Sequence, residues 1–515
     1  MKLLIIHPGI QHSYRLANAA VASGTFEEVH LQTSVLYPEQ EKPWLKSFQK
    51  RKKPILPEVR IHRHLIYELL ARLSRNVYNK IIINPNKQVH NNPIYVWQFI
   101  FGCICLPFLW RHRKNSLLVC FETAGWPLTY FAQKWGIPVV MDFASISHER
   151  AESLGIHETN LGKAIKIRER QHIDFAFFCS DFCRRSFEGR TAAKMDFVLY
   201  LGADAIVESG KWKVESIESG VGSPKLGVRS PKSEVGSEAA GEEEIREVSE
   251  VESLKSEVES REASEKSEVG GLKSEVGSEQ SANRESEVQS VESKVRGLDS
   301  EVEGKAASEK SEVRGPKSEV GNMDLGLKRR LKISFIANLE YRKGLDILLE
   351  ALYAYTYPAF LEVHLIGKIR KDWVAEHLPK TIVNDKVKLV YQPAMSQQEL
   401  FTYLAQQHFD LNVQPSRFDS FAMVVPETMM QGIPNLVSPF VGAGEMLQNG
   451  VDGFVMSELD AATLAQSISS FINLSHKELP NLKSEVLKKA AQMTWANYDL
   501  AVGEAMREVM AILGV

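Results

Sequence analysis

Two carboxylates stand eight positions apart in the stretch QPSRFDSFAMVVPETMMQGIPN, residues 414–435, one at Asp419 and one at Glu427. The residues before Asp419 are typical of a strand that ends near Pro415. Those around Glu427 are typical of the first turns of a short helix, where Pro426 costs no hydrogen bond. Two acids this far apart do not share a proton. They are placed to accept hydrogen bonds from vicinal hydroxyl groups at two points of one ligand.

Two basic residues precede another predicted helix. In the stretch EYRKGLDILLEAL, Arg342 and Lys343 stand directly before Gly344, just after the strand-like run KISFIANL. Cations at the entrance of a helix, together with the free N–H groups of its first turn, favour the binding of a diphosphate. Solvated surface charge is the alternative explanation for such a pair.

Other predicted strand ends contribute further candidates. The backbone amides near Phe421 and Ala422 are expected to face the ligand at the entrance of the short helix. Gly444 and Glu445, in FVGAGEML, follow the next strand and are predicted to close over the ligand. Gly9 follows the first strand and precedes a helix whose amino end could bind an anion, although ordinary turn chemistry would also explain this glycine.

These residues require a scaffold of alternating strands and helices. Strand-like runs in the first half are MKLLIIHPG, EEVHLQTSV, SLLVCFET, IPVVMDFAS, FAFFCS and DFVLYLGAD, and in the second half KISFIANL, LEVHLIGK, VKLVYQP, DLNVQPS and PNLVSPF. Helical runs lie between them, which predicts an α/β protein with two doubly wound parallel sheets. Ligands of such sheets bind beyond the carboxyl ends of the strands, where the candidate residues stand.

A low-complexity tract separates the two halves. The tripeptide Ser-Glu-Val returns at irregular intervals between about residues 208 and 326, and no aromatic residue occurs in 213–334. Such a tract has too little bulky apolar surface to offset the entropy of ordering the chain, so we expect an insertion that is disordered. A transient helix or coiled coil remains the alternative, because valine recurs at loosely heptad intervals.

Composition limits the class of partner. With 515 residues, 44% hydrophobic residues and a net charge of −3, the chain is expected to hold two domains and not to bind nucleic acid through bulk electrostatics. Five cysteines without metal-ligand spacing predict a reducing, cytoplasmic compartment. The start of the chain is predicted to be a strand and not a signal peptide.

One apolar segment leaves three alternatives open. The run IYVWQFIFGCICLPFLWRHRK, residues 94–114, is at the lower limit of length for a membrane span, but Gln98 and Pro107 weaken that interpretation. The second alternative is a helix buried in the first domain. In the third, the segment rests on the inner face of a membrane, with Trp97 and Trp110 at the interface and basic residues at the headgroups.

The region PSRFDSFAMVVPETMMQGIPNLVS, followed by GAGEMLQNGVDGFV, resembles the donor-binding region of glycosyltransferase family 4. IRERQHIDFAFFCSDFCRRSF, YLGAD and TWANYDLAVGEAM are similar to other segments of that family. The resemblance implies a GT-B fold of two Rossmann-like domains. It also implies an enzyme that transfers a sugar from a nucleoside-diphosphate sugar with retention of configuration, without a metal or another cofactor.

The resemblance also implies roles for individual residues. Asp419 matches the acid that contacts the transferred sugar, and Glu427 matches the acid that holds the ribose hydroxyls. Lys343 matches the basic residue at the diphosphate. His148, in VVMDFASISHE, matches a histidine that borders the acceptor and the anomeric centre, although a buried structural histidine would also fit.

Three positions depart from the family pattern. Asp419 replaces the usual glutamate, Ala422 replaces the usual glycine, and Asn338 stands where the family has an arginine, so that Arg342 would have to supply the second cation. These departures motivate an alternative function, a catalytically weak GT-B scaffold whose charged insertion recruits partners.

The predicted organisation has four parts: an acceptor domain over 1–206, the insertion over 207–327, a nucleotide-sugar-binding domain over 328–490, and a C-terminal helix over 491–515 that crosses back to the first domain. The predicted function is a hexosyltransferase-type enzyme of polysaccharide biosynthesis. Its predicted partners are a nucleotide sugar and a glycan or lipid-linked acceptor.

Overall fold

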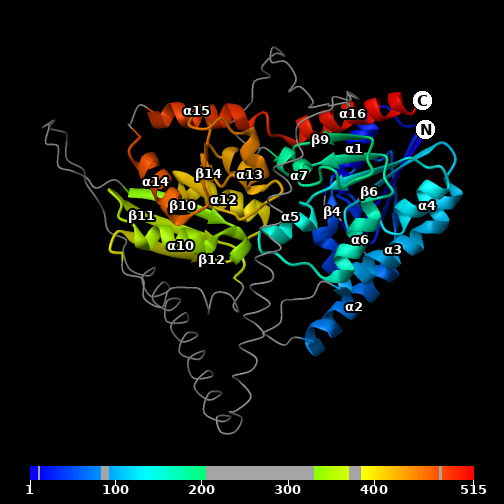
Figure 1. Cartoon of the computed structure of the whole chain (residues 1–515), viewed down its shortest axis with the longest axis horizontal. Helices are drawn as coiled ribbons and strands as arrows, with labels where there is room; N and C mark the ends of the chain where they lie inside the picture. Colours follow the sequence, from blue (N-terminus) through cyan, green and yellow to red (C-terminus); the bar gives the residue numbers. More distant parts are fainter. Residues whose placement is uncertain (10–11, 44, 83–91, 205–329, 370–383, 475–477) are drawn as a thin grey trace, which may run out of the picture. The chain divides into compact units, whose positions relative to one another are not determined.

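The computed structural model describes residues 1–9, 12–43, 45–82, 92–204, 330–369, 384–474 and 478–515. The predicted insertion over 207–327, and its predicted disorder, lie outside these residues. Two large parallel sheets, one on each side of this gap in the sequence, carry the described structure (Figure 1). The predicted fold class, α/β with two doubly wound parallel sheets, is confirmed.

The first sheet has seven parallel strands. In spatial order they are β5 (Val59–Arg63), β2 (Glu28–Thr33), β1 (Lys2–Ile6), β6 (Ser116–Phe121), β7 (Val139–Phe143), β8 (Phe175–Phe178) and β9 (Met195–Val198). The helices of this half are α1 (Ser13–Ala22), α2 (Leu65–Ile82), α3 (Asn92–Arg111), α4 (Leu128–Lys134), α5 (His148–Ser153), α6 (Asn160–Arg170) and α7 (Asp181–Arg185). The short strands β3 (Tyr37–Pro38) and β4 (Lys52–Lys53) form a separate pair, next to the 3-10 helix η1 (Lys46–Arg51).

The second sheet has six parallel strands. In spatial order they are β12 (Val387–Gln392), β11 (Phe360–Ile366), β10 (Arg330–Ile336), β13 (Leu411–Gln414), β14 (Asn435–Val437) and β15 (Phe454–Val455). Its helices are α10 (Leu345–Ala354), α12 (Gln397–Gln407), α13 (Val424–Met429), α14 (Ala461–Ile472) and α15 (Glu478–Ala490), with 3-10 turns η2 (Tyr341–Lys343) and η3 (Gly442–Met446). In both sheets the strand order reverses direction beside the first strand, which creates a switch point between β1 and β6 and another between β10 and β13.

Both faces of the first sheet are covered, which explains its continuous apolar strands. Leu3 and Ile5 belong to one core cluster, whereas Leu4 and Ile6 belong to another, and all four are fully buried. A strand buried on both faces loses the usual alternation of polar and apolar residues. Four of the five residues of strand β5 are not buried, so it has no continuous apolar run, and it was not among the predicted strands.

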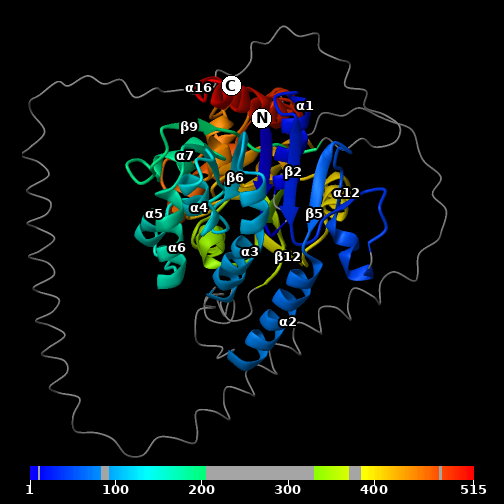
Figure 2. The same cartoon turned by 90° about the vertical axis from the view of Figure 1, so that its right-hand side faces the viewer.

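The last helix, α16 (Trp495–Ile512), packs on the first sheet although it follows the second in the chain. Its residues Val502, Met506 and Val509 are fully buried in the same cluster as Leu3 and Ile5. It lies beside α1 in both views (Figures 1 and 2).

Where the chain returns toward the first sheet, two backbone segments touch. The Ala203 amide donates to the Met493 carbonyl at 2.9 Å, and the Trp495 amide donates to the Ala203 carbonyl at 3.4 Å. A Cβ atom at Gly202 would stand 2.1 Å from the carbonyl carbon of Thr494. Only glycine therefore allows this close approach.

We expect Gly202→Ala to lower the free energy of unfolding by about 2–4 kcal/mol, because the new methyl group meets rigid backbone and not a flexible side chain. Urea unfolding followed by circular dichroism measures the change. Gly24→Ala is the control: Gly24 has a φ of +65° and open space around its Cβ position, so it should lose only about 1 kcal/mol from backbone strain. Equal losses in both variants would contradict the close approach.

Candidate functional site

The site forms at the switch point of the second sheet. Strands β10 and β13 are neighbours there, and the turns that follow them carry Lys343 and Asp419. The Lys343 Nζ atom donates to the Asp419 Oδ2 atom in a direct ion pair, and both side chains are largely buried. The two residues are 76 positions apart in the sequence, so the sheet topology alone brings them together.

A glycine and an arginine fix the turn that carries Lys343. Gly344 has a φ of +72°, and a Cβ atom there would stand 1.8 Å from the Pro415 carbonyl oxygen, so the two turns are in direct backbone contact. Arg417 donates to the Tyr341 carbonyl at 2.7 Å and makes a bidentate ion pair with Asp346 at 2.7 and 2.6 Å. These contacts hold Lys343 in place before any ligand binds.

Arg342, the other predicted cation, points to a different partner. Its guanidinium group pairs with Glu340 at 3.1 Å and lies 5.4 Å from the centre of the Phe418 ring. Its side chain is only partly buried.

Asp419 is engaged by both of its carboxylate oxygens. Oδ2 accepts from Lys343, and Oδ1 accepts from the Ala422 amide at 3.0 Å. This second bond closes the turn that leads into α13. Ala422 has a φ of +69°, in the left-handed region that favours glycine. The adjacent Phe421 side chain is buried in the core, and its carbonyl accepts from the Ala443 amide at 2.8 Å.

We expect Ala422→Gly to raise the free energy of unfolding by about 0.5–1 kcal/mol, because relief of left-handed strain outweighs the extra freedom of glycine in the unfolded chain. Urea unfolding provides the measurement. Ala351→Gly, in the regular helix α10, should instead lose stability. A loss in Ala422→Gly as well would show that the left-handed position is not strained.

Glu427 lies in the first turn of α13 and is half-buried. Its Oε1 atom accepts a hydrogen bond from Gln397 Nε2 at 2.9 Å, at the start of α12. Burial raises the pKa of Glu427 from 4.5 to about 7; the Gln397 hydrogen bond opposes the shift, and the nearby charge of Asp204 adds to it. Both carboxylate oxygens of Asp204 accept from the same nitrogen of Arg15 in α1, each at 2.8 Å.

A carboxyl group with a raised pKa in the folded state stabilises the fold below its ordinary pKa, and this contribution is lost as pH rises through about 7. We therefore expect Glu427→Gln to flatten the fall in stability between pH 5 and about 8. The difference between the urea midpoints of the two proteins, measured across this range, isolates Glu427 from other titrating groups. A constant difference at every pH would contradict the raised pKa.

Glu445, in η3, contacts the first half of the chain. Its carboxylate accepts from the amides of Asp181, at 2.7 Å, and Phe182, and lies 3.3 Å from an Arg185 nitrogen. It therefore caps the amino end of α7. Gly444 packs against Val437, which a Cβ atom would meet at 2.9 Å. Glu445 was predicted to close over a ligand, but in this structure its oxygens are already occupied by amides.

A second contact joins the halves next to Asp419. The Ser420 hydroxyl donates to the Ala144 carbonyl at 2.6 Å, and the Ser180 hydroxyl donates to the Ser420 carbonyl at 2.6 Å. Ala144 follows β7 and belongs to the same loop that leads to His148. The structure thus brings the loop that carries His148 next to the turn that carries Asp419.

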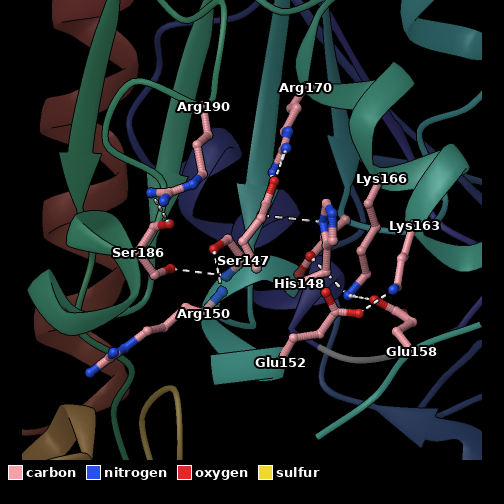
Figure 3. Close-up of polar contacts among 12 residues, drawn as sticks. Ser147, His148, Arg150, Glu152, Glu158, Lys163, Lys166, Arg170, Ser186 and Arg190 are labelled. Carbon is pink, nitrogen blue, oxygen red and sulfur yellow. Dashed lines mark hydrogen bonds and ion pairs between the residues drawn. The ribbon is translucent and has the colours of Figure 1, made fainter. Parts of the chain in front are cut away.

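His148 is the first residue of α5 and is buried (Figure 3). Its Nδ1 atom lies 3.3 Å from a carboxylate oxygen of Glu149, which also pairs with Arg170. Burial lowers the pKa of His148, and Glu149 partly opposes this shift. Glu158 and Lys166 also act on its charge, and Figure 3 shows their side chains beside it. A neutral imidazole at neutral pH can accept a hydrogen bond from a hydroxyl group.

Gly9 follows β1, and its amide donates to the His7 ring at 3.0 Å. Residues 10–11, which follow it, lie outside the described residues. His12, the next described residue, makes a buried 2.9 Å contact with Asp142 at the end of β7, and this charge raises the pKa of His12 against the effect of burial. Sequence reasoning missed this pair and the Arg15–Asp204 pair. The signals that could have indicated them were the places of His12 and Arg15 a few residues after Gly9, and of Asp204 as the last residue of YLGAD.

Among the described residues, no group of three or more histidine, cysteine, aspartate or glutamate side chains has the geometry of a metal site. The predicted absence of a metal remains a prediction.

Comparison with known proteins defines the class. The model of the family described as Glycosyl transferases group 1 matches residues 330–473. Sucrose-phosphate synthase from Thermosynechococcus elongatus has a similar structure, with a TM-score of 0.55, 13% identity, and coverage of 99% of this chain and 100% of that one. HepE of Anabaena, in complex with UDP, gives a TM-score of 0.52 with 13% identity and coverage of 99% and 100%.

The curated relatives match less than a third of this chain. Sucrose synthase of Thermosynechococcus vestitus is 25% identical over 142 residues, which are 28% of this chain and 15% of that protein. An uncharacterised 41.2 kDa protein in the cps region of Klebsiella pneumoniae is 24% identical over 143 residues, which are 28% and 37% of the two chains. The chain thus spans about 15% of the length of the sucrose synthases it matches.

Together, the two switch-point sheets and these comparisons define a protein of the GT-B fold. Residues 330–473 match the glycosyltransferase group 1 model, and Lys343, Asp419, Glu427 and Glu445 all lie within the matched residues. The predicted GT-B glycosyltransferase architecture is confirmed, and the assignment to family 4 remains a prediction.

Proposed function

We propose that the protein is a retaining glycosyltransferase of family 4, which moves a sugar from a nucleoside-diphosphate sugar to a hydroxyl group of a glycan or lipid-linked acceptor. The observation that supports this proposal most directly is the Lys343–Asp419 pair at the switch point of the domain that matches the glycosyltransferase model. The relative HepE was solved with UDP and with UDP-glucose, which supports a nucleotide sugar as donor.

Donor binding would exchange the partner of Lys343. A diphosphate carries more charge than the Asp419 carboxylate and would compete for the ammonium group. Released from Lys343, the Oδ2 atom of Asp419 could accept a hydrogen bond from a hydroxyl group of the transferred sugar, while Oδ1 keeps the Ala422 amide. The pair therefore holds the turn ready for a donor when no donor is present.

The remaining groups divide between the two ends of the donor. We assign Glu427 to the ribose hydroxyls. We assign Arg342 to a second phosphate contact, because Asn338 stands where family 4 has an arginine. The amides near Phe421 and Ala422 would face the sugar. Gly9, Gly444 and Glu445 are assigned to the outer wall of the site, and for Glu445 this role requires release from α7.

In the proposed reaction the acceptor oxygen bonds to the anomeric carbon on the face from which the nucleoside diphosphate departs with its electron pair. The proton of the acceptor hydroxyl group passes to the departing phosphate. Charge that develops on the leaving phosphate would be stabilised by Lys343, an electrostatic contribution of several kcal/mol in comparable sites. His148 would border the acceptor hydroxyl. We propose that the reaction needs no metal and no further cofactor, and that it takes place in the cytoplasm.

We expect Lys343→Ala and Asp419→Ala each to lower kcat/KM by about 10²-fold or more, since each removes a charge next to the leaving group or the sugar. Donor hydrolysis and transfer with a panel of UDP-, GDP- and ADP-sugars provide the measurement. Lys488→Ala removes an exposed lysine that pairs with Glu485 on α15, and it should leave kcat/KM unchanged.

Two outcomes would contradict this proposal in different ways. Turnover that survives in both variants would show that the site lies elsewhere. Absence of turnover with every donor, together with no rise in melting temperature on addition of nucleoside diphosphates, would favour the catalytically weak scaffold that Asn338, Asp419 and Ala422 motivate.

A further inference from the structure

Helices α2 and α3 expose apolar side chains on neighbouring surfaces of the first half. On α2, Ile66, Leu69, Leu70 and Leu73 are exposed, at the i, i+3, i+4, i+7 spacing of one helix face. On α3, Ile94, Val96, Phe99, Ile104 and Trp110 are exposed. Of the nineteen large hydrophobic residues that are exposed in the described part of the chain, nine thus lie on these two helices.

The two helices are in contact. The Tyr67 hydroxyl of α2 donates to the Trp97 carbonyl of α3 at 2.8 Å, and the Tyr67 ring packs 5.0 Å from the Phe101 ring. Figure 1 and Figure 2 both show α2 beside α3 at the border of the first half. We call the exposed apolar residues of these two helices together the α2–α3 surface. Soluble monomers rarely expose a large apolar surface without a binding partner.

The burial of α3 argues against a membrane span, the first of the three alternatives that its sequence left open. Residues 93–111 are long and apolar enough to cross a membrane, by length and composition. However, Phe101, Cys105 and Leu109 are fully buried in the same core cluster as Leu118 of β6. A membrane-spanning α3 would have to leave this core, and a wholly buried α3 would not expose Phe99 and Trp110. A helix with one face in the core and one face outside fits a surface contact.

Charge and aromatic groups indicate what the α2–α3 surface contacts. Helix α3 has no acidic residue, and it ends in a basic stretch that contains Arg111, Arg113 and Lys114. The Arg113 guanidinium lies 3.8 Å from the Trp110 ring, which packs 4.9 Å from Trp135. Tryptophan next to basic residues is typical of the boundary between lipid headgroups and acyl chains. With a net charge of −3, the whole chain is not attracted to anions, so this cluster must act locally.

We propose that the α2–α3 surface docks on a lipid bilayer that contains anionic headgroups. The apolar residues enter the boundary of the acyl chains, and the basic cluster meets the headgroups. If the proposed function also holds, a lipid-linked acceptor would reach the first half of the enzyme from this surface. The docking itself requires no donor and no transfer reaction, so its failure and the failure of the proposed function are separate results.

The experiment is sedimentation of the full chain with vesicles, without nucleotide sugar. We expect binding to vesicles of phosphatidylcholine and phosphatidylglycerol, weaker binding to phosphatidylcholine alone, and weaker binding at high salt. The double variant Leu70→Glu, Leu73→Glu should bind at least about tenfold less. The double variant Arg111→Glu, Lys114→Glu should lose about fivefold or more for each charge on anionic vesicles.

The matched control is Leu487→Glu, Leu500→Glu, which changes two leucines of comparable exposure on α15 and α16. It should bind as the unchanged protein does. Because all four leucines are exposed, the melting temperatures of both double variants should stay close to that of the unchanged protein. If melting shows that Leu70→Glu, Leu73→Glu has unfolded, Ile66→Glu, at the most exposed position of α2, takes its place.

Three results would overturn the proposal. The first is no binding to either type of vesicle. The second is an equal loss of binding in the control variant. The third is dimerisation without vesicle binding. If the unchanged protein is a dimer in sedimentation equilibrium and the Leu70→Glu, Leu73→Glu variant is a monomer, the α2–α3 surface binds a second copy of the chain.

Discussion

The backbone contact between two turns at the switch point of the second sheet is the constraint on which the site depends. Gly344 approaches the Pro415 carbonyl so closely that no side chain fits, and this contact sets Lys343 opposite Asp419. Because parallel strands place their carboxyl ends at one edge, residues 76 positions apart meet without any local sequence pattern. The cost of this closeness is a glycine in the left-handed region and an ion pair between two largely buried side chains.

The ion pair also explains how the departures from the family pattern fit together. Asp419 is one methylene shorter than the usual glutamate, yet it reaches both Lys343 and the Ala422 amide. The hydrogen bond from the Ala422 amide to Asp419 in turn holds Ala422 in the left-handed conformation. Family 4 has glycine at this position. A shorter acid and a strained alanine thus form one hydrogen-bonded turn, and a change in either residue acts on the other.

Much of the fold and part of the site could be predicted from the sequence. Strands buried on both faces, such as Lys2–Ile6, give unbroken apolar runs, and the strand ends located Lys343 and Asp419 correctly. Edge strand β5 gave no such run. The partners of Glu427 and Glu445 could not be predicted, because Gln397, Asp204 and the amides of α7 come from distant segments whose meeting depends on tertiary packing.

The contact of Ala203 with Met493 and Trp495 ties the end of the first half to the start of α16. Two hydrogen bonds join these backbone segments, so one segment cannot move away from the other without breaking both. Because α16 is also buried against the first sheet, it should move with the first half as one rigid unit, although the chain reaches it only after the second sheet.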